Sequence, residues 1–146
     1  MKYIAYGSNM NQEQFVRRCP GAQLIGTGLL HGYQLEFNRH ATIVESSGSM
    51  APVPVTVWEI TPEHEALLDQ YEGFPLYYRK LTCQVEMAVG EQVEGMVYQM
   101  NWFIHNPPGN TYFQVIREAY ESLGLRSEIK KTLQPALMRS QQLARG

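Results

Sequence analysis

Residues 2–10 read KYIAYGSNM, a short apolar stretch followed by a small polar loop. The stretch predicts a strand over residues 2–6, and Asn11 with Gln14 three residues later predicts the start of a short helix. Amides at a helix start have no acceptor within the helix, and the helix dipole places positive charge behind them. The loop Tyr6–Met10 can therefore hold a carboxylate, a phosphate or a developing oxyanion, although a plain turn with an Asn cap explains the same residues.

Glycines interrupt the strand-like pattern that follows this loop. Residues 23–37 are cut by Gly26, Gly28 and Gly32, which indicates bends or bulges in a strongly curved sheet. Apolar residues then predict further strands, of which the last two are joined as a hairpin near Gly90. These strands cover residues 41–44, 53–60, 79–88 and 92–101, with a loop over residues 46–49.

A helix in the middle of the chain carries the second candidate for chemistry. Thr61, Pro62 and Glu63 have the signature of a helix start, and Gly73 is placed to end the helix after Glu72. In the last turn the helix dipole disfavours the ionised form of Glu72, and burial against aromatic neighbours would raise its pKa further. A glutamate tuned to about 6–7 is a good proton shuttle at neutral pH. A solvated glutamate before a glycine cap is the alternative interpretation.

The C-terminal third of the chain is predicted to be helical. Apolar residues recur at helical spacing over residues 112–123. A last helix from about residue 127 is expected to kink or split at Pro135, and residues 140–146 are expected to form a loose tail. Strands first, with helices inserted and then appended, predict an α+β fold with a closed or half-closed sheet.

The composition is that of an ordinary globular chain. The 146 residues are 44 % hydrophobic, with 12 basic against 14 acidic side chains and a net charge of −2. The length fits one domain, residues 1–146, and the charge balance gives no basic groove for nucleic acid. No apolar run approaches the roughly 18 residues of a membrane helix, so we expect no membrane partner and a cytoplasmic location.

The remaining reactive residues give no cofactor pattern. Cys19 and Cys83 cannot found a disulfide scaffold, and each is interpreted as a free, partly buried thiol. The histidines lack metal-ligand spacing, and the chain has no P-loop, Rossmann glycine pattern or GxSxG elbow. We therefore expect neither a metal nor a cofactor.

Three polar residues near the middle helix have open roles. Asp69 is interpreted as a surface or supporting carboxylate rather than a catalytic one, although it can share a helix face with Glu72. Arg79 can pair with Asp69, with Glu72 or with a substrate carboxylate. His40, after a predicted strand, is interpreted as a surface or packed histidine rather than a base.

The order of several short motifs is more specific than any one of them. YGSN stands at residues 6–9, GLLHGYQLEFN at 28–38, VWEI at 57–60 and LDQYEG at 68–73, followed by Tyr78-Arg79. In this order the motifs resemble the γ-glutamylcyclotransferase-like family, which includes the γ-glutamylamine cyclotransferases and AIG2-like proteins. The resemblance covers nearly the whole chain, and YGSN and LDQYEG are specific as a pair.

The resemblance implies a mixed β-barrel with helices packed around it. It implies that Glu72 is the catalytic acid/base and that the N-terminal loop holds the γ-glutamyl group through backbone amides. The adjacent Tyr77 and Tyr78 leave open which tyrosine faces the site. The resemblance is also compatible with a homodimer. The implied substrate-binding residues are Tyr6, Gly7, Ser8, Asn9, Met10 and Tyr78.

The implied reaction is an intramolecular ring closure. The α-amine of a γ-glutamyl compound attacks its own γ-carbonyl, which gives 5-oxoproline and releases an amine or amino acid. Glu72 would move the protons, and the loop amides would stabilise the oxyanion. The alternatives are a cyclotransferase specific for γ-glutamyl amines or a biosynthetic intermediate, and a non-catalytic binding module on the same fold.

Overall fold

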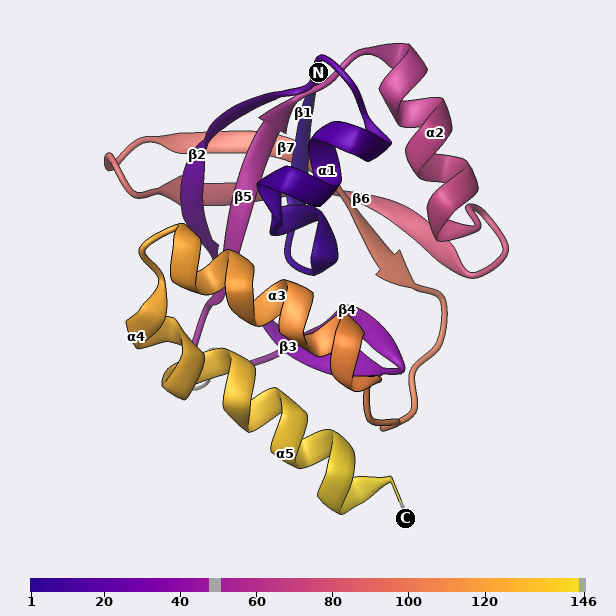
Figure 1. The fold of residues 1–146 in the computed structure, drawn as a ribbon, viewed down its shortest axis with the longest axis vertical. Helices are drawn as coiled ribbons and strands as arrows, with labels where there is room; N and C mark the ends of the chain where they lie inside the picture. The colour runs from indigo at the N-terminus through magenta and orange to yellow at the C-terminus, as the bar shows by residue number, and fades with distance from the viewer. Residues whose placement is uncertain (48–50, 145–146) are drawn as a thin grey trace.

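The computed structural model describes residues 1–47 and 51–144. Its centre is a closed barrel of five strands: β1 (Lys2–Ala5), β2 (Gln23–Leu30), β5 (Val53–Glu59), β6 (Tyr78–Met87) and β7 (Gln92–Met100). The order around the barrel is β1-β5-β2-β6-β7 (Figure 1). Because β1 pairs with β5 antiparallel and with β7 parallel, the barrel is mixed. The predicted α+β fold with a mixed barrel is confirmed, and the sheet is closed rather than half-closed.

The glycines of β2 let this strand curve and pass close to its neighbour. The pairing of β2 with β5 shifts register between Leu24 and Gly26, as a bulge does. A Cβ on Gly28 would lie 2.5 Å from Val85 Cγ1 and 2.7 Å from the Glu86 carbonyl oxygen. No larger residue fits there without moving β6, so Gly28 permits the close crossing of β2 and β6.

A separate two-stranded sheet lies beside the barrel. It pairs β3 (Tyr33–Asn38) with β4 (His40–Glu45), and Arg39 makes the turn between them with a φ of 62°. The Gln99 side-chain amide donates to the Ile43 carbonyl at 3.0 Å, and the Met100 amide donates to Thr42 Oγ1 at 3.0 Å. These bonds fix β4 and the β3–β4 turn against the end of β7.

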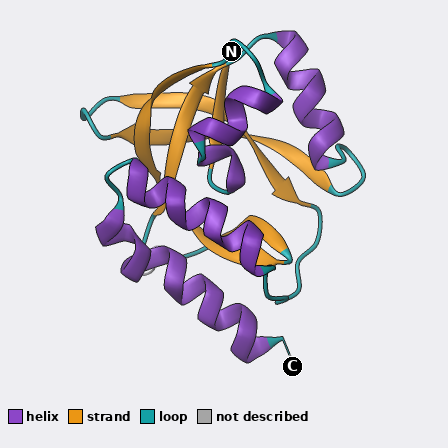
Figure 2. Cartoon of the chain, in the orientation of Figure 1, coloured by secondary structure: helices purple, strands orange, loops and turns teal. Residues whose placement is uncertain are grey.

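Helical segments surround the two sheets. α3 and α5 lie at the same end of the molecule as β3 and β4, whereas α2 lies near the N-terminus at the other end (Figure 2). The segments are η1 (Ser8–Met10), α1 (Gln12–Arg18), α2 (Pro62–Glu72), α3 (Asn110–Ser122), α4 (Arg126–Glu128), η2 (Ile129–Leu133) and α5 (Gln134–Leu143).

Aromatic packing joins α1 to the barrel. Phe15 is fully buried, with its ring centroid 5.6 Å from that of Tyr3 and 4.5 Å from that of Trp58. The predicted cap of α1 is confirmed, because Asn11 Oδ1 accepts the Gln14 amide at 3.1 Å. The cap and the buried ring together set where α1 begins and which face it turns to β1 and β5.

The C-terminal helices differ from the prediction at their end. The last helix is divided near Pro135, as expected. A π-helical turn, η2, ends directly before α5 begins. The expectation of a loose tail from residue 140 was wrong for residues 140–143, which continue α5 with Ser140 buried. Arg139 explains the order, because its Nε donates to Glu36 Oε1 at 3.0 Å and its Nη2 donates to the Leu35 carbonyl at 2.9 Å.

Two other predictions concern thiols and a loop. Cys19 and Cys83 are both free, as predicted, and both are buried more completely than expected. The predicted loop over residues 46–49 lies partly outside the described residues.

Candidate active site

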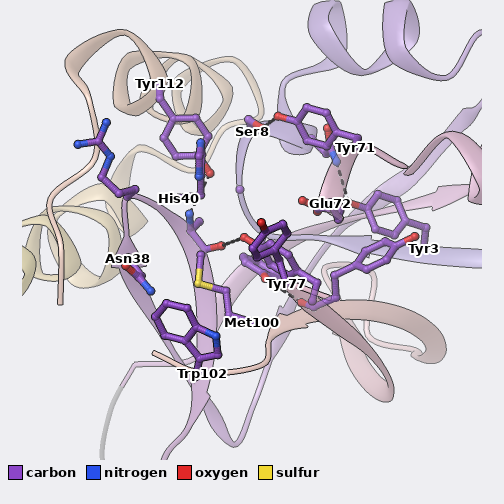
Figure 3. Close-up of a pocket in the computed structure, with 17 residues that line it drawn as sticks. Tyr3, Ser8, Asn38, His40, Tyr71, Glu72, Tyr77, Met100, Trp102 and Tyr112 are labelled. Atoms are coloured by element: carbon purple, nitrogen blue, oxygen red, sulfur yellow. Dashed lines mark hydrogen bonds between the residues drawn. The ribbon is translucent and has the colours of Figure 1, made fainter. Parts of the chain in front are cut away.

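A pocket with a volume of about 500 Å³ lies where η1, the end of α2, the β3–β4 turn and β7 meet. Figure 3 shows Glu72 and Tyr3 at one end of the pocket and Trp102 at the other. The lining brings together Tyr6, Gly7, Ser8, Asn9 and Tyr78 of the predicted site with Glu72. Residues more than sixty positions apart in the sequence thus share one cavity.

Gly7, Ser8 and Asn9 of the N-terminal loop line this pocket. Within the turn, the Met10 amide donates to the Gly7 carbonyl and the Asn11 amide to the Ser8 carbonyl, both at 3.0 Å. The amides of Gly7, Ser8 and Asn9 precede these donors and have no acceptor in the turn. They are the candidates for an anion or oxyanion site.

Met10 does not fit its predicted role. Its amide already bonds within the turn, and its side chain is fully buried and does not line the pocket. The structure therefore places Met10 outside the pocket lining, unlike the other predicted substrate-binding residues. Met10 instead anchors η1 in the hydrophobic core.

Glu72 is the last residue of α2, and the way this helix ends places it. Gly73 has a φ of +73° and ends the helix in a left-handed cap, as predicted. Burial raises the pKa of Glu72 to about 7, and the nearby Arg18 guanidinium opposes part of that rise. At neutral pH this carboxyl is close to half ionised, which suits a group that both accepts and donates protons.

Arg18, at the end of α1, connects the loop to the end of α2. Its Nη1 donates to Asn9 Oδ1, and its guanidinium carbon lies 3.5 Å from the centre of the Tyr71 ring. Ser8 Oγ and the Tyr71 hydroxyl oxygen are 3.5 Å apart. The loop and the end of α2 are thus joined through side chains on both sides of Tyr71, the residue before Glu72.

Tyrosine hydroxyls make up much of the remaining wall. The Tyr6 hydroxyl donates to the Tyr98 carbonyl at 2.7 Å, and the Tyr78 hydroxyl donates to the Ala41 carbonyl at 3.1 Å. Burial raises the pKa of Tyr6 and Tyr78 above the ordinary value, and nearby Glu72 raises it further. These tyrosines therefore stay neutral. Of the nine tyrosines, seven line the pocket: Tyr3, Tyr6, Tyr71, Tyr77, Tyr78, Tyr98 and Tyr112.

Comparison with known proteins identifies the family of this fold and pocket. A family model described as "Gamma-glutamyl cyclotransferase, AIG2-like" matches residues 3–117. The chain belongs to this family. The match includes η1, α2 and both halves of the pocket.

Individual relatives in this family are distant in sequence. The chain is 29 % identical to a gamma-glutamylcyclotransferase of Bos taurus over 144 residues, which covers 90 % of this chain and 76 % of the bovine protein. It is 26 % identical to a gamma-glutamylcyclotransferase of Homo sapiens, with the same coverage of 90 % and 76 %.

Solved structures agree on the fold. One named gamma-glutamyl cyclotransferase matches with a TM-score of 0.79 at 26 % identity, covering 87 % of this chain and 82 % of its own. The crystal structure of YkqA from Bacillus subtilis also has a TM-score of 0.79, at 21 % identity, covering 94 % of this chain and 54 % of its own. The second match supports the fold alone.

In this γ-glutamyl cyclotransferase family member both neighbouring tyrosines contact the pocket, at different depths. Tyr78 is buried and its hydroxyl is fixed on the Ala41 carbonyl. Tyr77 is 60 % exposed and lines the pocket from its mouth. Tyr78 therefore belongs to the inner wall and Tyr77 to the entrance.

Asp69 lies behind the pocket wall. Its Oδ1 accepts the Tyr98 hydroxyl at 2.6 Å and pairs with Lys80 Nζ at 2.9 Å, and Lys80 Nζ also pairs with Glu65 at 2.8 Å. The suggestion that Arg79 pairs with Asp69 was wrong, because Lys80 holds that position and Arg79 is exposed. The supporting role predicted for Asp69 agrees with these contacts.

Sequence reasoning missed four residues of the site. Tyr3 was assigned only to a strand and Tyr112 only to a helix core, and Tyr98 and Arg18 were not singled out. The Tyr3 hydroxyl accepts Asn9 Nδ2 at 2.9 Å, and the Tyr112 hydroxyl accepts the Ala41 amide at 2.9 Å. The signal that could have found the three tyrosines is the high number of tyrosines, nine in 146 residues, whereas the sequence holds no comparable signal for Arg18.

The other wall of the mouth carries Asn38, Arg39 and His40 from the β3–β4 turn. Partial burial and the neighbouring Arg39 lower the pKa of His40, so its ring is largely neutral at pH 7. Within residues 1–47 and 51–144, no three His, Cys, Asp or Glu side chains are arranged to hold a metal ion. In the same residues, no helix is both long and apolar enough to cross a bilayer.

Proposed function

We propose that the chain is a γ-glutamylcyclotransferase that closes the γ-glutamyl group of its substrate into 5-oxoproline and releases an amine or amino acid. The observation that carries this proposal is that Glu72, with a pKa raised to about 7, lines one pocket together with Gly7, Ser8 and Asn9. An acid/base with a pKa near neutrality and an oxyanion site are the two groups that this ring closure requires.

Two tyrosine hydroxyls of the pocket keep hydrogen-bond donors that a substrate can use. The hydroxyls of Tyr3 and Tyr112 act as acceptors within the protein, from Asn9 Nδ2 and from the Ala41 amide. Each hydroxyl therefore keeps its proton for a ligand oxygen. With the loop amides holding the γ-carbonyl oxygen, these hydroxyls are suited to the substrate carboxylate.

The protein's main contribution is to hold the folded-back substrate. When the γ-glutamyl chain bends, its α-nitrogen comes within bonding distance of its γ-carbonyl carbon, and the attack becomes intramolecular. A new C–N bond forms, and the carbonyl oxygen becomes an oxyanion that the amides of Gly7, Ser8 and Asn9 stabilise.

Glu72 moves the proton that links the two halves of the reaction. The α-nitrogen transfers one proton to the Glu72 carboxylate as it attacks, and protonated Glu72 returns one to the departing nitrogen as the old C–N bond breaks. The former ammonium loses its second proton to solvent, and the released amine takes one up. The protons therefore balance over the whole reaction, and Glu72 returns to its ionised form.

The experiment is a 5-oxoproline assay of the purified protein with a panel of γ-glutamyl amino acids and γ-glutamyl amines. Turnover by the wild-type chain that Glu72→Gln abolishes, with the fold intact by circular dichroism, would support the proposal. A panel that yields no 5-oxoproline would favour a binding module, and turnover of γ-glutamyl amines alone would indicate the amine-specific alternative.

A further inference from the structure

Two large aromatic side chains stand exposed at the mouth of the pocket. Trp102 is 65 % exposed and Tyr77 is 60 % exposed, and both line the pocket together with Met100. In Figure 3 Trp102 and Met100 lie away from Tyr3 and Glu72, at the far end of the cavity. We call Tyr77, Met100 and Trp102 the apolar shelf.

Hydrogen bonds fix the backbone that carries this shelf. The Asn101 side-chain amide donates to the Pro75 carbonyl at 2.9 Å and to the Leu76 carbonyl at 2.8 Å. The Asn101 backbone amide donates to the Tyr77 carbonyl at 3.0 Å. The segment after β7 is thereby tied to the segment before β6, so the shelf is formed before any ligand arrives.

The Tyr77 ring is also held from behind. It packs so closely on the end of α2 that a Cβ on Gly73 would lie 2.6 Å from Tyr77 Cδ2. Gly73 thus ends the helix that carries Glu72 and makes room for the ring at the mouth. The acid and the shelf are positioned by the same turn.

The direction of the bound substrate connects the shelf to the leaving group. The loop amides and Glu72 occupy the inner end, so the γ-carbonyl lies there and the group attached to it points toward the mouth. Among the described residues that line the pocket, Glu72 is the only carboxylate. A leaving group with an added positive charge would therefore find no anionic partner at the mouth, whereas an apolar one would cover the shelf.

We propose that the leaving group is an amine or amino acid with an aromatic or branched apolar side chain, which packs against Tyr77, Met100 and Trp102. This inference rests on the proposed cyclotransferase function and names the substrate class of the same site. The shelf acts on binding of the leaving group and takes no part in the proton transfers, so it changes KM more than kcat.

The experiment compares kcat/KM for γ-glutamyl-phenylalanine, γ-glutamyl-leucine and γ-glutamyl-alanine, with γ-glutamylbenzylamine as an aromatic substrate that lacks the second carboxylate. We expect the phenylalanine and leucine compounds to exceed the alanine compound by about tenfold, mainly through KM. Trp102→Ala should remove most of this preference, because it lowers kcat/KM for the phenylalanine and leucine compounds far more than for γ-glutamyl-alanine. Equal turnover of γ-glutamylbenzylamine and γ-glutamyl-phenylalanine would show that the ring alone is recognised.

The matched control is Ile104→Ala, which removes a 58 % exposed apolar side chain from the same segment, outside the pocket. It should leave the preference intact. Turnover of all amino acid compounds with equal kcat/KM, or an equal loss on all of them in Trp102→Ala, would overturn this inference while leaving the cyclotransferase function standing. If none of the γ-glutamyl compounds released 5-oxoproline, the proposed function would be overturned, and this inference with it.

Discussion

Asp69 and Glu72 lie one helical turn apart on α2, but their carboxyl groups have opposite surroundings. Asp69 accepts a hydrogen bond from Tyr98 and pairs with Lys80. In the described part of the chain, Glu72 has no hydrogen-bond or ion-pair partner, and burial raises its pKa to about 7. Spacing along a helix thus identifies two candidate acids, but only the neighbours from other segments decide which one can exchange protons at neutral pH.

The largest expected effect is a difference in activity between variants of the two carboxyl groups. Glu72→Gln should lower kcat by about a thousandfold, the middle of the range for loss of a general acid/base. Asp69→Asn should cost less than about tenfold, because Asp69 reaches the pocket only through the Tyr98 hydroxyl. Steady-state assays on one γ-glutamyl substrate make this comparison. Equal losses in the two variants would remove the distinction on which the assignment depends.

The raised pKa of Glu72 also predicts that Glu72→Gln is more stable than the wild-type protein above neutral pH. The folded chain keeps the Glu72 proton up to about pH 7, whereas the unfolded chain releases it near pH 4.3. The folded state therefore binds more protons between these values, and the free energy of unfolding falls as pH rises through them, by up to about 4 kcal/mol. Glu72→Gln lacks this penalty and should be more stable than wild type at pH 8 but not at pH 4.

Urea unfolding of both proteins at the two pH values measures the effect. Glu59→Gln is a suitable control, because this carboxylate is exposed and its partners, the N-terminal ammonium first among them, lower its pKa. A stability of Glu72→Gln that follows that of wild type across pH 4–8 would contradict a raised pKa for Glu72.

The stability of Asp69→Asn should change in the opposite direction. The substitution removes the charge that pairs with Lys80 and weakens the acceptor of the Tyr98 hydroxyl, at a cost of about 1–2 kcal/mol at pH 7. Glu65→Gln removes the other partner of Lys80 without touching Tyr98 and should cost less. Denaturant melts measure both, and a larger loss in Glu65→Gln would show that Tyr98 does not depend on Asp69.

The smallest expected effect concerns Arg18. Its positive charge lowers the pKa of Glu72, so Arg18→Met should raise that pKa and move the acidic limb of the kcat/KM profile to higher pH. Arg18→Lys keeps the charge and should leave the limb near its wild-type position. The pH dependence of kcat/KM for the two variants is the measurement. An unmoved limb in Arg18→Met would limit Arg18 to holding Asn9 and Tyr71.

Local signals explain why much of this structure could be predicted from sequence. Thr61 and Gly73 mark both ends of α2, because a capping hydroxyl and a left-handed glycine act through neighbours a few residues away. The glycines of β2 indicated a curved sheet, and the order of YGSN and LDQYEG indicated the family. These features do not depend on which distant segments meet.

The missing parts of the site depend on distant segments. Tyr112 has the spacing of a core residue, and only the fold shows that its hydroxyl reaches the Ala41 amide. Arg18 is one of two adjacent arginines, and its contact with Tyr71 joins residues 53 positions apart. The motif also identifies a loop but not which of its amides the turn itself uses, as the Met10 amide is used by the Gly7 carbonyl.

The most direct test is the titration of the Glu72 carboxyl by carbon-13 NMR of glutamate side chains, with Glu72→Gln to assign the signal. The account predicts a midpoint near pH 7 for Glu72 in the free protein. A midpoint near 4.3, the ordinary value for a solvated glutamate, would contradict it, because such a carboxyl could not return a proton to the departing nitrogen at neutral pH.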